Sequence, residues 1–102
     1  MDDCPPDPVP PEGSLIRELT LTNKKGLHAR ASARFVQTVE KFDADVRVMR
    51  CGEIVGGTSI MGLMMLGAGP GTTITVEATG PQAAEVVAAL AALVAGRFTE
   101  GE

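Results

Sequence analysis

The chain lacks the residues on which several common functional sites depend. Its 102 residues include no Trp, no Tyr, one His and two Cys. Without Trp or Tyr there is little to stack on nucleic-acid bases, and one histidine without CxxC or HxxxH spacing offers a metal ion too few ligands. Cys4 and Cys51 are too few for a disulfide framework, so both are interpreted as free thiols. We predict no metal site and no cofactor.

Long apolar runs and an excess of basic charge are also missing. No apolar stretch approaches the length of a membrane span, and the N-terminus lacks the basic and apolar regions of a secretory signal. The net charge of −4 arises in the first thirteen residues, which hold four of the 13 acids and no base. From Ser14 onward nine acids balance nine bases. We therefore expect a cytoplasmic protein without a nucleic-acid partner or membrane insertion.

The length and the 44% apolar content suit one domain with one core. Residues 1–13 contain five of the seven prolines, which predicts a disordered acidic leader. The folded domain is expected over residues 14–98, followed by a frayed tail over 99–102.

Hydrophobic periodicity predicts an α+β chain. Alternation predicts strands over residues 15–22, 45–50, 54–55 and 72–79, and helical spacing predicts helices over 29–41, 60–66 and 81–96. The order is β-α-β-β-α-β-α, and alternating strands imply a sheet with helices on one face and solvent on the other. The glycine-rich segment 67–71 is interpreted as a connector, because no lysine follows it as in phosphate-binding loops.

The stretch Gly26–Phe35 (GLHARASARF) places the one histidine where a strand gives way to a helix. A helix start carries unpaired N–H groups and partial positive charge, so it favours an anion. His28 at that point, with Arg30 and Arg34 nearby, can carry a phosphoryl group and stabilise its charge. The alternative is a surface or capping histidine without a chemical role.

Two motifs resemble the HPr family, the histidine-containing phosphocarriers of the bacterial phosphoenolpyruvate-dependent phosphotransferase system. They are NKKGLHARASARF at Asn23–Phe35 and TSIMGLMMLG at Thr58–Gly67, within a resemblance that runs from about Leu15 to Phe98. It implies an open-faced sandwich with a four-stranded antiparallel sheet and three helices on one face. Ala31 stands where the family has proline. We expect it to reduce rigidity rather than change the chemistry, because proline is favoured but not required in a first helical turn.

The resemblance also implies residue roles. His28 would take a phosphoryl group on Nδ1 from phosphorylated enzyme I and pass it to an enzyme IIA domain, in either the sugar or the nitrogen-related branch. Arg30 matches the arginine that can bind phosphate oxygens, and the N–H group of Ala29 would add a neutral donor. Arg34 is interpreted as either a solvated arginine or a docking residue.

The second motif predicts a regulatory site and a docking surface. Ser59 matches the serine phosphorylated by an HPr kinase/phosphorylase, although it also suits an ordinary helix N-cap. The six apolar residues between Ile60 and Leu66 cannot all face inward on a short helix. Ile60, Met61 and Met64 are therefore expected to form an exposed apolar strip for protein partners.

Two other function classes are compatible with these residues. A small phosphatase-like enzyme would use Arg30 and the anion site at the helix start for hydrolysis, although no second acid–base residue lies near His28 in the motif. A regulatory binding module would depend on Ser59 and not on His28. Labelling from phosphoenolpyruvate distinguishes the three classes.

Overall fold

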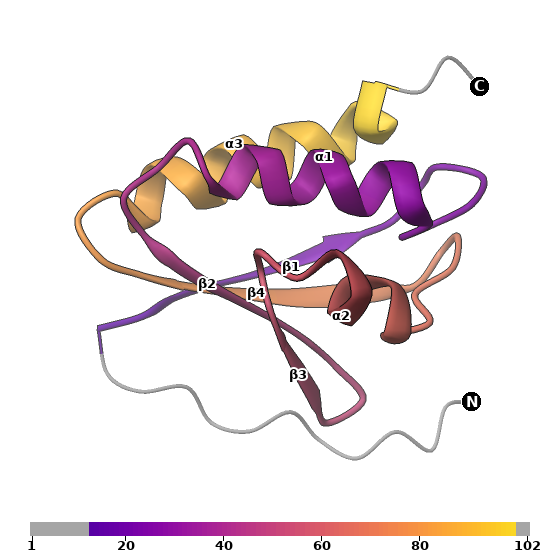
Figure 1. Cartoon of the computed structure of the whole chain (residues 1–102), viewed down its shortest axis with the longest axis horizontal. Helices are drawn as coiled ribbons and strands as arrows, with labels where there is room; N and C mark the ends of the chain where they lie inside the picture. Colours follow the sequence, from indigo (N-terminus) through magenta and orange to yellow (C-terminus); the bar gives the residue numbers. More distant parts are fainter. Residues whose placement is uncertain (1–12, 100–102) are drawn as a thin grey trace.

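The computed structural model of the chain describes residues 13–99, so the predictions for residues 1–12 and 100–102 lie outside the described residues. Its elements follow the predicted order (Figure 1). They are β1 (Leu15–Thr20), α1 (Ala29–Val39), β2 (Asp45–Arg50), β3 (Glu53–Gly56), α2 (Ile60–Met65), β4 (Thr73–Thr79), α3 (Ala83–Ala95) and the short 3₁₀ helix η1 (Arg97–Thr99). Among the described residues no helix is long and apolar enough to cross a membrane.

The four strands form one antiparallel sheet in the order β1-β4-β2-β3. The three helices lie together over one face of this sheet, and no helix covers the other face (Figure 1). The predicted open-faced sandwich is therefore confirmed. Because α1 follows β1 directly, the strand-to-helix turn lies at one end of the sheet, and this turn carries the histidine.

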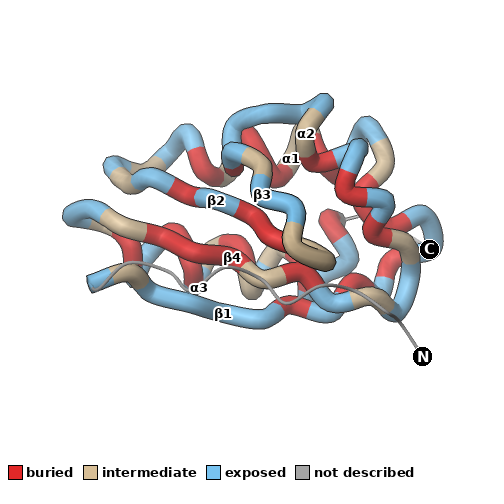
Figure 2. Tube along the Cα trace, turned by 90° about the horizontal axis from the view of Figure 1, so that it is seen from below, coloured by how far each residue is buried: buried red, intermediate tan, exposed pale blue. Residues whose placement is uncertain are grey.

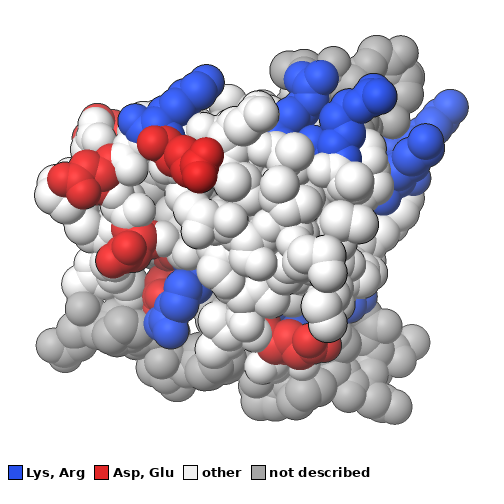
Figure 3. Space-filling view, viewed as in Figure 1, with Lys and Arg blue, Asp and Glu red and all other residues white. Residues whose placement is uncertain are grey.

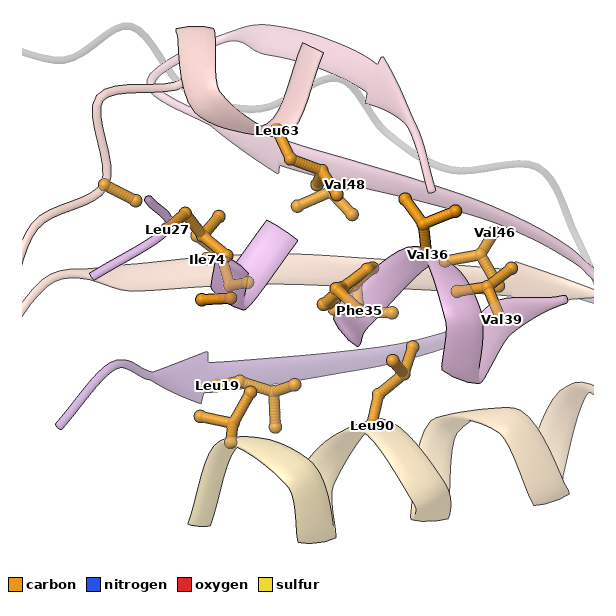
Figure 4. Close-up of a cluster of buried hydrophobic side chains, with 14 of the residues drawn as sticks. Leu19, Leu27, Phe35, Val36, Val39, Val46, Val48, Leu63, Ile74 and Leu90 are labelled. Atoms are coloured by element: carbon orange, nitrogen blue, oxygen red, sulfur yellow. The ribbon is translucent and has the colours of Figure 1, made fainter. Parts of the chain in front are cut away.

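The core lies between the sheet and the helices. Every second residue of β4 is fully buried, as the alternation predicts, and Val48 of β2 lies beside them. Phe35 of α1, Leu63 of α2 and Leu90 of α3 point toward this sheet surface (Figure 4). Burying such a side chain contributes about 1.5–3 kcal/mol, so these apolar stripes hold the helices on the sheet.

Several details differ from the sequence prediction, including the bounds of β1 and β3. Helix α1 ends at Val39, two residues early, and α3 begins at Ala83, so Pro81 lies in the turn before that helix. Glu77 lies on the open face as expected, yet it is only 3% exposed. Arg47 explains how its charge is tolerated, because the guanidinium donates to both carboxylate oxygens over 2.6 and 2.9 Å. The hydrogen bond and charge of Glu77 raise the pKa of Arg47.

The β2–β3 hairpin turn contains Cys51 and Gly52, both with left-handed φ angles of 53° and 81°. Two such residues in succession are typical of the tight turns that join antiparallel strands. Cys51 is disulfide-bonded in the structure, so its interpretation as a free thiol is wrong. Cys4 lies outside the described residues.

Candidate functional site

His28 is the N-cap of α1. Its backbone is extended (φ −79°, ψ −178°), and its carbonyl accepts the first intrahelical hydrogen bond, from Ser32 N over 2.8 Å. The imidazole makes no capping bond, and the first turn contains no acidic residue. The N–H groups of Ala29, Arg30 and Ala31 precede that first bond and have no acceptor within the helix. This helix start therefore offers an anion several backbone donors and the positive end of an 11-residue helix.

The side chains around this helix start are accessible. His28 is half-buried, whereas Ala29 and Arg30 are exposed. Within residues 13–99 the Arg30 guanidinium makes no hydrogen bond or ion pair. Arg34, one helical turn further on, is half-buried. Arg30 is therefore available for a phosphate, while Arg34 is more enclosed.

A tight contact with the segment before β4 holds the turn in front of His28. Leu27 N donates to Ala68 O over 2.9 Å, and Gly26 has a left-handed φ of 59°. A Cβ atom at Gly26 would lie 2.1 Å from Ala68 O, which no side chain can tolerate. The buried Asn23 closes the turn by donating from Nδ2 to Gly26 O over 2.8 Å. Only glycine therefore fits at position 26, and this contact sets where the helix begins.

The same two segments are joined by two further backbone hydrogen bonds. Leu21 N donates to Thr72 O over 2.9 Å, and Gly71 N donates to Leu21 O over 2.7 Å. The glycine-rich segment 67–71 thus connects α2 to β4 and also supports the turn that carries His28. Sequence reasoning identified the connector but missed its supporting contacts with Leu21 and Gly26. A glycine placed two residues before the histidine was the available signal.

Ser59 is the N-cap of α2, and its Oγ accepts a hydrogen bond from Gly62 N over 3.0 Å. The residue is exposed, so a modifying enzyme can reach its hydroxyl. Helix α2 packs against α1 and β3, which places the second motif on the same side of the sheet as the first (Figure 1).

The apolar residues of α2 divide between core and surface. Leu63 is fully buried and Leu66, which follows the helix, is nearly so. The predicted residues Ile60, Met61 and Met64 are all exposed, as expected. The structure adds Met65, which is 72% exposed and which sequence reasoning missed. We call Ile60, Met61, Met64 and Met65 the α2 strip.

Charge is unevenly distributed around this site. Lys24, Lys25, Arg30 and Arg34 are the charged residues between Leu21 and Val39, and Glu40 is the first acid after them. Figure 3 shows several Lys and Arg side chains gathered over the end of the molecule where α1 begins, whereas most of the visible Asp and Glu lie toward the opposite end, among a few further basic side chains. The surface over α2 is largely uncharged. An acidic partner with an apolar patch would match both regions.

The candidate site is an open surface rather than a pocket. A concavity elsewhere on the sheet is lined by residues that include Asp45, Arg47, Thr58 and Glu77, and no predicted site residue lines it. In the part of the chain that the structure describes, no group of three or more His, Cys, Asp or Glu could hold a metal ion. The arrangement suits transient transfer between proteins.

Comparison with known proteins agrees with this geometry. A family model described as "PTS HPr component phosphorylation site" matches residues 15–96. "Phosphocarrier protein HPr" of Cupriavidus necator is 51% identical over 88 residues, covering 86% of this chain and 99% of that protein. The protein of the same name from Neisseria meningitidis serogroup A is 48% identical over 88 residues, with the same two coverages.

A solved structure gives the same result for the fold. The crystal structure of HPr-C-His from Thermoanaerobacter tengcongensis superimposes with a TM-score of 0.82 at 36% identity, covering 86% of this chain and 99% of that one. The relatives from Cupriavidus necator and Neisseria meningitidis are phosphocarrier proteins by name. With a histidine at an uncapped helix start and similarity over nearly the whole described domain, the chain belongs to the HPr family of phosphocarrier proteins of the phosphotransferase system.

Proposed function

We propose that His28 accepts a phosphoryl group from phosphorylated enzyme I and donates it to an enzyme IIA domain in the cytoplasm. The observation that carries this proposal is the accessible imidazole at the start of α1, where the first-turn N–H groups have no side-chain cap. A site of this kind favours a dianion that remains within reach of a visiting protein.

The transfer is a displacement at phosphorus. The lone pair of the His28 imidazole nitrogen, Nδ1 by family resemblance, forms a new P–N bond while the bond between phosphorus and the donor's nucleophile breaks. The three phosphoryl oxygens keep their negative charge throughout. Arg30 can donate two hydrogen bonds to them, and Ala29 N–H can donate a third. In the second step an acceptor nucleophile on the enzyme IIA domain displaces His28.

The test is labelling with phosphoenolpyruvate and catalytic amounts of enzyme I. We expect one acid-labile phosphate per chain, because a phosphoramidate hydrolyses in acid whereas a serine ester does not. Release of free phosphate without a labelled chain would instead support a phosphatase-like enzyme. Labelling confined to Ser59, requiring ATP and a kinase, would support a regulatory module.

Arg30→Ala is expected to slow phosphoryl transfer about 10- to 100-fold and leave the fold intact. A charged hydrogen bond contributes about 1.5–3 kcal/mol, which corresponds to this range. Arg30 is exposed and makes no described side-chain contact that the fold needs. Single-turnover transfer from phosphorylated enzyme I measures the effect.

The matched control for this prediction is Arg17→Ala, which removes an exposed arginine from β1 and should leave the rate unchanged. If Arg30→Ala instead unfolds the chain, or if both variants slow transfer equally, the role assigned to Arg30 is wrong.

We further propose that Ser59 is a regulatory phosphorylation site for an HPr kinase/phosphorylase. Its exposed hydroxyl at the start of α2 supports this, because added negative charge is favourable at a helix N-terminus. The same charge would lie on the surface that partners approach. Phosphorylation would therefore inhibit transfer while leaving α2 formed.

A pair of substitutions tests the charge at Ser59 separately from its capping role. Ser59→Asp and Ser59→Asn both keep an N-cap side chain of similar size, and only the first is negative. We expect Ser59→Asp to slow transfer from enzyme I about tenfold, corresponding to about 1.4 kcal/mol of repulsion. Ser59→Asn should transfer at nearly the wild-type rate. Equal rates for the two variants would rule out an electrostatic block.

We propose that the α2 strip docks enzyme I and enzyme IIA domains, and that Arg34 of α1 also contributes to docking. Exposed methionines adapt to partners of different shape, which suits a carrier that visits unlike proteins. With ¹³C-labelled methyl groups, Met61 and Met64 should shift when enzyme I is added. Met49, which is buried in the sheet, is the internal control. If the methyl signals of Met61 and Met64 do not shift in a saturated complex, the α2 strip is not the docking surface.

A further inference from the structure

Two buried polar side chains lie beside the turn that carries His28. Buried residues recur along β2, β4 and the helices (Figure 2), and nearly all of them are apolar. The polar exceptions in the part of the chain that the structure describes are Glu77, Asn23 and Ser32, and the last two are both 0% exposed. A buried polar group is costly unless it forms hydrogen bonds. The atoms that Asn23 and Ser32 bind therefore indicate what these side chains do.

Both side chains donate to backbone carbonyls that lie directly before His28. Asn23 Nδ2 donates to Gly26 O over 2.8 Å, and Ser32 Oγ donates to Leu27 O over 3.3 Å. His28 N donates to the same Gly26 O over 2.9 Å. The peptide unit that joins Leu27 to His28 is therefore held at both ends. Its oxygen is held by Ser32, and its N–H group is held by a carbonyl that Asn23 anchors.

The preceding peptide unit, between Gly26 and Leu27, is held in the same way. Its N–H group donates to Ala68 O over 2.9 Å, and its oxygen is the acceptor shared by Asn23 and His28. Two successive peptide units with fixed planes determine the φ angle of His28, and with it the direction of the imidazole relative to the first-turn N–H groups of α1. A misplacement of about 1 Å at a reacting group can slow a reaction about a hundredfold.

We propose that Asn23 and Ser32 are positioning residues for phosphoryl transfer, which fix the direction of the His28 imidazole by holding the peptide unit in front of it. We call these two residues the His28 clamp, and the proposal rests on the proposed function of His28. Neither residue can touch the phosphoryl group or a partner, because both are buried. Loss of either should therefore slow transfer within the complex with enzyme I and leave the affinity for enzyme I unchanged.

Two variants and one matched control test the His28 clamp in the full-length chain. Asn23→Ala and Ser32→Ala each remove one donor, and Ser32→Ala should fold readily because alanine favours a helix. Thr38→Val is the control. It removes a hydroxyl that donates to Arg34 O over 2.9 Å near the other end of α1, with little change in size. Circular dichroism confirms that each variant is folded under the conditions of the measurements.

Hydrogen exchange measures the His28 clamp without any phosphoryl transfer. The chain contains one histidine, so labelling with ¹⁵N-histidine gives one backbone amide signal, which belongs to the peptide unit that the clamp holds. We expect this amide to exchange at least about fivefold faster in Asn23→Ala and in Ser32→Ala than in wild type, because the turn opens more easily. The Thr38→Val control should exchange at the wild-type rate.

Single-turnover transfer from phosphorylated enzyme I, measured over a range of enzyme I concentrations, separates positioning from docking. The rate at saturation should fall about tenfold in Asn23→Ala and about threefold in Ser32→Ala, whose hydrogen bond is the longer one. The enzyme I concentration that gives half of this rate should stay at its wild-type value. Thr38→Val should match wild type in both quantities.

Wild-type saturating rates in both folded clamp variants would overturn the proposal. So would an equal loss of rate in Thr38→Val, because lower stability alone would then explain the slower transfer. A change confined to the half-saturating concentration would assign the two residues to docking instead. If wild type itself takes no label, the proposed function of His28 is wrong, and the hydrogen exchange of the His28 amide still decides whether Asn23 and Ser32 hold the turn.

Discussion

His28→Ala will leave the chain folded and unable to carry phosphate. The chain contains one histidine, so no second imidazole can replace the lost nucleophile. Transfer from phosphorylated enzyme I should fall at least about a hundredfold, and the acid-labile label should be absent. His28 is half-buried and its side chain does not cap α1, although the residue takes part in another interaction. The free energy of unfolding should therefore fall by about 1 kcal/mol, which leaves the chain folded.

His28→Gln is the matched variant, because it keeps a polar side chain that can form hydrogen bonds at the N-cap but cannot form the phosphoramidate. Both variants should be unlabelled with phosphoenolpyruvate and enzyme I, with thermal unfolding close to that of wild type. Acid-labile phosphate on either variant would place the acceptor elsewhere. A large loss of stability in both would show that His28 is mainly structural.

Gly26→Ala will destabilise the chain and displace the start of α1. The new Cβ would lie 2.1 Å from Ala68 O and 2.7 Å from Gly69 Cα, so one of the two backbone segments must move. The left-handed backbone costs about 1 kcal/mol for alanine, and overpacking typically adds about 1–3 kcal/mol. We expect a loss of about 2–4 kcal/mol in urea unfolding, together with slower phosphoryl transfer in the fraction that remains folded.

Gly67→Ala separates the clash from the backbone strain. Gly67 also has a left-handed φ, of 66°, but a Cβ there would have no atom within 4 Å. This variant should lose only about 1 kcal/mol and transfer phosphate at the wild-type rate. Equal losses for the two variants would mean that the contact between Gly26 and Ala68 does not hold the site.

Much of this protein follows from local patterns. The strand over Asp45–Arg50 and the N-cap at Ser59 were identified from alternation and from a hydroxyl residue before an apolar run. The position of His28 at a helix start was likewise deducible from the apolar periodicity that follows it. Residues within a few positions of one another determine such features, so a single sequence is sufficient to predict them.

Other features required contacts between distant parts of the chain. The periodicity of β4 predicts that Glu77 lies on the open face, but it does not predict that Glu77 is buried. That burial depends on Arg47, thirty residues away. The disulfide at Cys51 also contradicted an expectation drawn from cysteine count alone. Hydrophobic patterns indicate which face of an element is apolar, but they contain no information about which partner will cover a polar face.

The sequence by itself determined the order of the elements and the family, and it predicts His28 and Arg30 as the residues that carry the chemistry. The tertiary structure decided how that chemistry is supported, by packing Gly26 against Ala68 and by leaving Met65 in solvent while Leu63 enters the core. The physical reason is that periodicity is a local property of the chain, whereas close packing and exposure depend on residues brought together only by folding.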